Sequence, residues 1–269
     1  MIVNTNTAFN GVFTILISGH YAWSTEKSVF VSATPSEGIQ TFTATDGLTV
    51  FHDLANPFGG GLWFSLINKI TFRGDGTIDI FAGCITAPQE RLRIATIDSS
   101  SANMFNNLQL YGRCRTYVLA KGVVSWNKTN SIPMTYNYPI GSKGVIMSQA
   151  FPDVNPNNSS SYNNYLIQKP DPNGPENIIV VYEVASIAKN VEVNLFEHIK
   201  AETTSLKVFT SADMNTTFTS VSTYQQYLNY TIPKNSEGIL LRFTVLSSAG
   251  ALQYLTTVLI SILVYLSHA

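Results

Sequence analysis

The sequence predicts an all-β protein: two consecutive jelly-roll-like β-sandwiches followed by a C-terminal hydrophobic tail. Short segments rich in Val, Ile, Phe, Thr and Tyr recur along the chain, separated by clusters of turn-forming residues. Only 12% of the residues are charged, and no long stretch shows the amphipathic spacing of a helix. At 269 residues the chain can hold two domains of about 110 residues each.

The first predicted sandwich covers residues 24–130, and a linker rich in Pro and Asn follows over residues 131–143. Its strand-like segments are SVFVSA, IQTFTA, LTVFHDL, LWFSLI, KITFRG, GDGTIDIFAG, RLRIATI and TYVLAKGVVSW. In GDGTIDIFAG, Ile78 and Ile80 alternate with Asp79, which is the period of a strand with one buried face.

The second predicted sandwich covers residues 144–248. Its strand-like segments are GVIMSQAF, YNNYLIQK, ENIIVVYEV, VEVNLFEHI, SLKVFTS, YLNYTI and GILLRFTVLSS. Apolar residues fall on both faces of NIIVVYEV and GILLRFTV, which indicates central strands, whereas VEVNLFEH alternates like a strand with one outward face.

Residues 249–269 are predicted to be a separate hydrophobic tail, with three possible roles. A glycolipid-anchor signal needs small residues before a spacer and an apolar end, and Ser247 and Ser248 would be its attachment residues. A transmembrane helix needs about 20 apolar residues and usually basic flanks. A buried strand or helix is the third possibility. We favour the anchor signal, because the apolar run extends almost to the last residue.

An anchor signal requires entry into the secretory pathway, yet residues 1–23 form at most a weak signal peptide. The apolar run VFTILI is short, and no basic residue precedes it. FTILIS at 13–18 is similar to FTVLSS at 243–248, 230 residues later, or two units of about 115. The segment is therefore either a weak signal peptide or the last strand of a preceding domain.

Cys84 and Cys114 can close one disulfide across about 30 residues if the chain is secreted, and two buried free thiols are the alternative. Neither cysteine has the spacing of a zinc site. Five Asn-x-Ser/Thr sequences are candidate N-glycosylation sites of a glycoprotein: Asn127, Asn157, Asn158, Asn215 and Asn229.

No motif in the sequence supports catalysis, a cofactor or a metal site, so we expect no enzyme. His52 and Asp53 are adjacent on a strand, so they face opposite sides and cannot act together on one face. The PFGGG stretch at 57–61 indicates a turn, because no nucleophile elbow accompanies it. A formal net charge of −1 gives no reason to expect nucleic acid as a partner.

Tyrosines in two segments are candidate contacts for a partner, because Tyr is favoured at interfaces. YNNYL and STYQQYLNY are expected to be contact loops, with Tyr162, Tyr165, Tyr224 and Tyr227 as the binding residues. Positions in the core or on an edge strand are the alternative for each of them.

The second half resembles a CUB domain, an extracellular jelly-roll sandwich. The stretch from 144 to 170 is similar to the family's opening, with a Gly-x-Ile-x-Ser, an aromatic-Pro pair and an Asn-rich turn. The matching residues are Gly144, Ile146, Ser148, Phe151, Pro152, Asn157, Tyr165 and Ile167. ENIIVVYEV and GILLRFTVLSS resemble later strands of the family, and TIDIFAG and LYGRC resemble it in the first half.

The style of the chain, with few cysteines and much Asn and Thr, resembles the divergent CUB-like surface proteins of nematodes. Many CUB domains bind calcium through a Glu and two Asp, but Ala82 and Thr210 stand where the motif has Asp. Glu183, Asp75 and Asp79 are at most remnants of such a site, and solvated surface acids are the alternative.

The sequence therefore predicts a non-enzymatic binding or adhesion protein, secreted and held at the outer face of the plasma membrane by its C-terminal anchor. The resemblance implies recognition of an extracellular protein or a glycan, with a role in surface defence. Two alternatives stay open: a jelly-roll glycan-binding protein or hydrolase, and a viral capsid-type jelly roll. The oligomeric state and the identity of the ligand stay open as well.

Overall fold

The computed structural model describes residues 26–32, 37–44, 48–54, 64–112, 114–129, 138–149, 151–154, 160–168, 177–199, 202–222 and 225–247. These residues form seventeen β-strands and three short 3-10 helices, η1 (Glu90–Leu92), η2 (Ala102–Phe105) and η3 (Ser211–Asp213), and no α-helix. The all-β prediction is confirmed. No helix in this described part is long and apolar enough to cross a membrane. Residues 1–23 and the tail at 249–269 lie outside the described residues.

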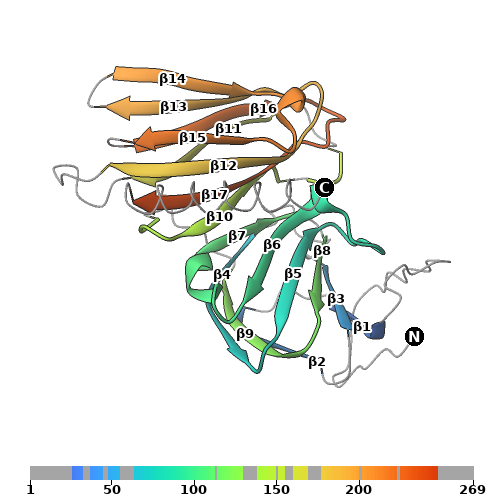
Figure 1. Ribbon diagram of the computed structural model, residues 1–269. Coiled ribbons are helices and arrows are strands. Elements are labelled where there is room, and N and C mark those ends of the chain that lie inside the picture. The colour runs from blue at the N-terminus through green and yellow to red at the C-terminus, as the bar shows by residue number, and fades with distance from the viewer. Residues whose placement is uncertain are drawn as a thin grey trace, which may run out of the picture.

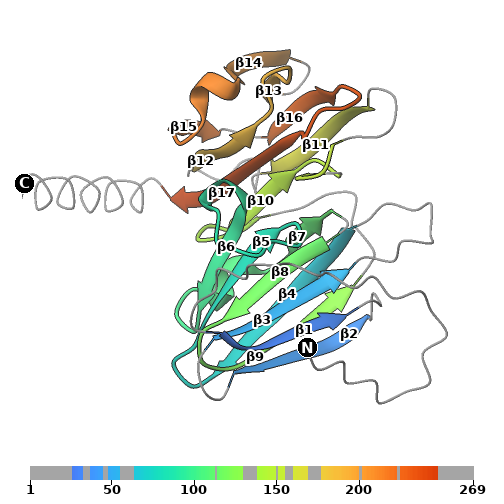
Figure 2. The ribbon, with the colours of Figure 1, turned by 90° about the vertical axis from the view of Figure 1, so that its right-hand side faces the viewer.

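Residues 26–129 form two sheets that face each other (Figures 1 and 2). Sheet A has the order β1 (Glu26–Ser32), β3 (Leu48–Leu54), β8 (Cys114–Leu119), β5 (Thr77–Ala82) and β6 (Arg93–Asp98). Sheet B has the order β2 (Gly38–Ala44), β9 (Gly122–Thr129), β4 (Phe64–Arg73) and β7 (Leu108–Tyr111). Strand β1 is parallel to β3, and the other described pairs are antiparallel.

Residues 143–247 form two further sheets, which make a second sandwich. Sheet C has the order β10 (Lys143–Met147), β17 (Ile239–Ser247), β12 (Ile178–Ile187) and β15 (Thr217–Ser222). Sheet D has the order β11 (Ser160–Gln168), β16 (Gln225–Ile232), β13 (Val193–Ile199) and β14 (Glu202–Phe209). Because β12 and β17 each have two neighbours, both are central strands, as the apolar runs predicted.

The two sandwiches share one connectivity once β1 is set aside. In each set of eight strands, the first, eighth, third and sixth form one sheet, and the second, seventh, fourth and fifth form the other. Gly122 begins the eighth strand of the first set, and Gly238 precedes that of the second, 116 residues later. Both have positive φ angles, and a Cβ on Gly238 would lie 1.9 Å from the Ser148 hydroxyl. The N-terminal copy of the predicted repeat lies outside the described residues.

Alternating side chains build the two cores. In β16, Gln226, Leu228, Tyr230 and Ile232 are buried, whereas the residues between them are half-buried or exposed. In the first sandwich, Phe42 of sheet B packs on Tyr117 of sheet A, with ring centroids 5.4 Å apart, and both contact Trp126. Aromatic side chains of this size contribute much of a core's buried apolar area.

The sandwiches are joined by a packed junction, and most of the linker predicted at 131–143 lies outside the described residues. Tyr138 is 2% exposed and lies edge to face against Phe243, so the second core starts before the predicted boundary at 144. Val145 and Met147 of β10 belong to the apolar cluster of the first sandwich. Figure 2 shows β10 at the side of the second sandwich that lies next to the strands of the first. The apolar contacts hold the two halves together.

Several strand assignments differ from the sequence prediction. TYVLAKGVVSW was expected to be one segment but is divided between β8 and β9, and β7 was not predicted as a strand. LWFSLI and KITFRG were expected to be two strands, but their residues 64–73 form the single strand β4, which has a register irregularity where Lys69 has a positive φ angle. Strand β15 was not predicted at all, because its sequence TFTSVS carries few apolar residues. Its pairing with β12 supplies the stabilisation that its own pattern lacks.

Candidate functional site

A cluster of charged side chains lies inside the first sandwich, between its two sheets. Asp53 lies near the end of β3, and its Oδ2 accepts hydrogen bonds from Lys128 Nζ on β9 at 2.9 Å and Arg115 Nη1 on β8 at 3.4 Å. Arg115 Nη1 also donates to the Ser65 hydroxyl at 2.9 Å. Asp53, Arg115 and Lys128 are 6%, 2% and 1% exposed. The cluster therefore joins sheet A to sheet B in a nearly dry environment.

Two cations share one carboxylate in this cluster. The Tyr117 hydroxyl donates to the same Asp53 oxygen at 3.3 Å, and burial raises the pKa of Tyr117 well above its ordinary value. Tyr117 therefore stays protonated and acts as a donor. Buried ions are stable only when they are paired and hydrogen-bonded, so Asp53 is the residue on which the cluster depends.

His52 lies on the opposite side of sheet A from Asp53, as the alternation of the strand predicted: it bonds to Thr116, whereas Asp53 bonds to Arg115 and Tyr117 on either side of Thr116. The Thr116 hydroxyl donates to Gly83 O at 2.8 Å and accepts from Ile85 N at 3.0 Å. Because this hydroxyl has only one hydrogen, His52 Nδ1, which lies 3.0 Å from its oxygen, must be the donor of their bond. The Nδ1-protonated tautomer is thereby fixed.

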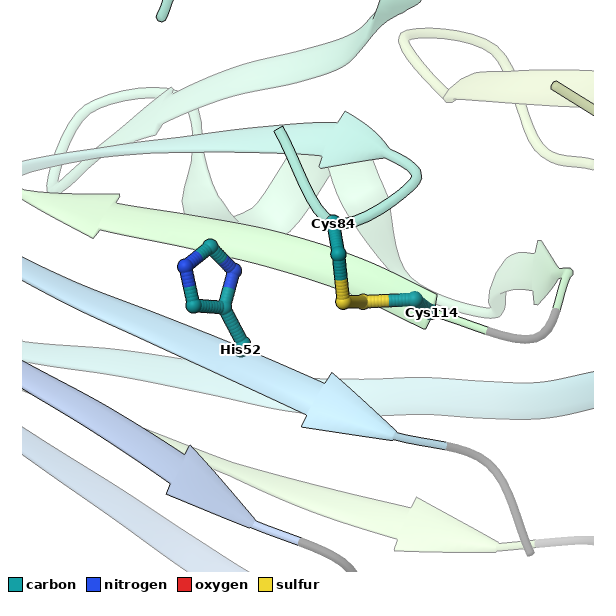
Figure 3. A group of neighbouring side chains, drawn as sticks. All are labelled: His52, Cys84 and Cys114. Atoms are coloured by element: carbon teal, nitrogen blue, oxygen red, sulfur yellow. A yellow bond between two sulfur atoms is a disulfide. The ribbon is translucent and has the colours of Figure 1, made fainter. Parts of the chain in front are cut away.

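The His52 ring also lies beside the Cys84–Cys114 disulfide (Figure 3). The predicted disulfide is present, with 5.2 Å between the two Cα atoms. Burial lowers the pKa of His52 to about 4, so the ring is neutral at physiological pH. One ligand atom from each of the three residues lies within 4.8 Å of the others, a grouping that could hold a metal ion only after reduction of the disulfide.

Arg242 of β17 connects the two sandwiches. Its Nε donates to Arg93 O at 2.9 Å and its Nη2 to Glu90 O at 3.0 Å, while its Nη1 pairs with Glu183.

The three acids named as possible remnants of a calcium site lie in different places. Asp79 accepts a hydrogen bond from Thr96, and Glu183 pairs with Arg242. The third remnant, Asp75, is exposed in the turn between β4 and β5. Asp79 and Glu183 are therefore used in local pairings.

The outer face of sheet D carries a neutral aromatic and amide surface. Phe196 of β13 and Tyr227 of β16 are half-buried and stacked, with ring centroids 5.2 Å apart and planes inclined by 22°. In the next row of the sheet, Asn229 of β16 stands opposite Asn194 of β13. On the other side of β16, Asn163 and Tyr165 of β11 pair in register with Asn229 and Tyr227.

The predicted contact tyrosines lie mostly in strands. Tyr162 and Tyr165 are part of β11, the edge strand of sheet D, and Tyr227 is part of the central strand β16. The expectation that these three occupy loops is wrong, because β11 and β16 pair with each other at all three positions. Tyr224 lies outside the described residues, and whether these tyrosines bind a partner stays a prediction.

The predicted modification sites lie in different surroundings. Asn215 is exposed in the turn before β15, whereas Asn127 and Asn229 are half-buried in the central strands β9 and β16. Ser247 is the last residue of β17 and stands opposite Ile178. Asn157, Asn158 and Ser248 lie outside the described residues. Modification at all of these positions stays a prediction.

Sequence reasoning missed the buried ion cluster. A signal was present in β9, where Val124, Trp126 and Lys128 follow the same inward alternation, so that the lysine must be buried with them. The partners of Lys128 come from strands distant in sequence, and no local pattern identifies them. No family model matches the chain, and a search of curated proteins finds no significant match.

Proposed function

We propose that the chain is a non-enzymatic recognition protein of the extracellular surface, made of two CUB-like jelly rolls and held by a C-terminal anchor. The observation that carries the proposal is the connectivity shared by the two sandwiches. Eight strands that alternate between two four-stranded sheets in this order are the arrangement of a jelly roll. The disulfide adds support, because disulfides persist mainly in oxidising compartments.

The surface that best suits a protein partner is the free edge of the second sandwich. Strands β14 and β15 are edge strands of sheets D and C, and η3 connects them. Three apolar side chains along this segment are substantially exposed: Val208, Met214 and Val221, at 39%, 42% and 50%. Exposed edges with apolar side chains are templates for strand addition by a partner.

The first experiment tests the location of the protein. The full chain is expressed in cultured animal cells with a secretion signal supplied, and the cells are treated with phosphatidylinositol-specific phospholipase C. Release of a protein that ends near Ser247 supports an anchored ectodomain. An intact tail in a membrane fraction would replace the anchor by a membrane span. An intact tail in soluble, self-assembling protein would contradict the surface function and favour the capsid alternative.

The second experiment tests recognition. Protein released from the cells is applied to arrays of extracellular proteins and glycans, together with the edge variants Met214→Lys and Val221→Lys. Ile39→Lys is the matched control, because Ile39 is 82% exposed on β2 of the other sandwich. We expect the edge variants to lose at least tenfold in affinity for a bound protein and the control to lose little. Equal binding by all variants would remove this edge from the function.

A further inference from the structure

The outer face of sheet D brings a glycosylation sequence and an aromatic surface together. Asn229, Tyr230 and Thr231 form the sequence, and Tyr227 precedes Asn229 by two residues on β16. Because side chains of a strand alternate, residues two apart share a face and lie about 7 Å from each other. Tyr230 is buried, whereas Tyr227 and Asn229 are half-buried, which places the latter two on the outward face.

The aromatic surface belongs to the protein fold itself and does not need a sugar to form. Phe196 stacks on Tyr227 at 5.2 Å between ring centroids, so the position of the Tyr227 ring is restricted from one side. Asn194 and Asn229 stand opposite each other in the adjoining row, and both are uncharged amides. The outward residues of β13 and β16 are Asn194, Phe196, His198, Gln225, Tyr227, Asn229 and Thr231, with no Asp, Glu, Lys or Arg among them. A neutral face with an aromatic centre suits an uncharged sugar.

We propose that Asn229 carries an N-linked glycan whose first sugar packs on the Tyr227–Phe196 pair and stabilises sheet D. The sugar's axial C–H groups carry partial positive charge, and the face of an aromatic ring is negative. The occupant of this face is then the chain's own glycan. The inference rests on the proposed function, because only a chain that enters the secretory pathway receives such a glycan.

The covalent step uses a lipid-diphosphate-linked oligosaccharide of the host cell as the donor. The amide nitrogen of Asn229 forms a bond to C1 of the first sugar, and the bond between C1 and the phosphate oxygen breaks. The amide loses one proton, and the lipid diphosphate leaves. The transfer occurs on the unfolded chain, so a strand position that faces outward after folding is compatible with it.

Asn127 provides a matched control within the same chain. It also lies in a central strand, β9, and is also half-buried. The residue two positions before it is Ser125, whose hydroxyl bonds to Thr41 Oγ1 at 2.9 Å. A glycan on Asn127 would therefore have no aromatic ring at the equivalent place. Asn215 is exposed, so a glycan on Asn215 shows that the chain has entered the compartment in which N-glycosylation occurs.

The experiment is a double-mutant cycle on the full chain secreted from animal cells. Occupancy of each sequence is measured by mass spectrometry after enzymatic deglycosylation. Melting temperatures are measured for the parent chain, Tyr227→Thr, Thr231→Val and the double variant. Thr231→Val removes the glycan and keeps Asn229. We expect it to lower the melting temperature by about 2–4 °C in the parent and by less than about 1 °C in the Tyr227→Thr background.

Thr129→Val, which removes the glycan from Asn127, is expected to give the same shift in both backgrounds. An unmodified Asn229 beside an occupied Asn215 would overturn the proposal and leave the proposed function standing. An equal effect of Thr231→Val in both backgrounds would also overturn it, because the glycan would then be independent of the Tyr227 ring. A chain that stays in the cytosol without any glycan would contradict the proposal together with the proposed function.

Discussion

Two equivalent positions in the two sandwiches are filled by different chemistry. Arg115 is the second residue of β8, and Gln226 is the second residue of β16, the strand at the same place in the shared connectivity. Both are buried between their sheets. Arg115 belongs to the ion cluster around Asp53, whereas Gln226 Oε1 accepts hydrogen bonds from Tyr182 at 2.8 Å and Ser220 at 3.1 Å.

At this place the fold therefore tolerates either an ion cluster or a network of uncharged hydrogen-bonding side chains, although the second sandwich also buries one carboxylate, Glu197, opposite Gln226 in the sheet. The difference lies in what each network requires. Buried charges need every partner in place, whereas a neutral network can be replaced by apolar groups at little cost. The first sandwich also contains the disulfide and the buried His52, while residues 143–247 contain no cysteine. We expect the stability of the first sandwich to depend on its buried charges, on the redox state of its disulfide and on pH. The stability of the second sandwich should depend on them much less.

The largest effect is expected from Asp53→Asn. The side chain keeps its size, but Arg115 and Lys128 lose their shared anion, so unfolding free energy should fall by about 3–5 kcal/mol. Urea unfolding followed by tryptophan fluorescence measures this, because Trp126 lies in the first core. Asp75→Asn is the control, since Asp75 is exposed and should cost less than about 0.5 kcal/mol. A loss below about 1 kcal/mol for Asp53→Asn would show that the cluster is not a single unit.

The second-largest loss of stability is expected from removal of the disulfide. Replacing Cys84 and Cys114 by Ser together opens a loop with a sequence separation of 30 residues, and the chain-entropy model gives a loss of about 3–4 kcal/mol. The loss should appear in the tryptophan signal of the first sandwich. Reduction of the unaltered protein should reproduce it. If the double variant unfolds at the same urea concentration as the parent, the disulfide contributes nothing to this sandwich.

Acid should weaken the first sandwich through His52. The pKa of His52 is about 4 in the folded chain, against 6.5 for a fully exposed histidine, so the unfolded chain binds more protons between these values. Stability is therefore unaffected above about pH 6.5 and falls by about 3 kcal/mol as the pH drops to about 4. Urea midpoints between pH 4 and 7 measure this, and His52→Gln should flatten the dependence. A slope that persists in His52→Gln would assign it to other groups.

Most strands could be predicted from the sequence, because the local pattern of apolar and polar residues indicates them. The central positions of β12 and β17 followed from apolar runs on both faces, and the opposite faces of His52 and Asp53 followed from the period of a strand. Strand β15 could not be predicted, because pairing with β12 rather than its own composition stabilises it. Sheet neighbours and junction contacts depend on residues distant in the chain.

The candidate sites were less accessible to sequence reasoning. The disulfide needed only the count of cysteines, and Asn229 needed only its sequence motif. The aromatic surface beside Asn229 required the register that sets Phe196 opposite Tyr227. The ion cluster required four strands to converge on Asp53 and Ser65. Patterns in one strand indicate which side chains are buried, but they do not indicate what those side chains meet.

A smaller effect is expected at the junction, where two arginines connect the sandwiches. Arg242→Met removes hydrogen bonds to two backbone carbonyls and should cost about 1–3 kcal/mol. Arg91→Met is the matched control, because Arg91 and its partner Glu237 are each about half exposed and should cost less than about 1 kcal/mol. The measurement compares tryptophan fluorescence with far-ultraviolet circular dichroism. Arg242→Met should separate the two unfolding curves, and coincident curves would mean that apolar contacts alone couple the sandwiches.

The smallest effect is expected from the neutral network of the second sandwich. Gln226 Nε2 is a buried donor with no hydrogen-bond partner among the described residues, so this network is incomplete in the folded chain. Gln226→Leu alone would deprive the buried Tyr182 hydroxyl of its acceptor and cost about 1–3 kcal/mol. Adding Tyr182→Phe removes that hydroxyl, so the double variant should lie within about 1 kcal/mol of the parent in urea unfolding. If the double variant were as unstable as Asp53→Asn, the neutral network would be as indispensable as the ionic one, and the contrast between the two sandwiches would fail.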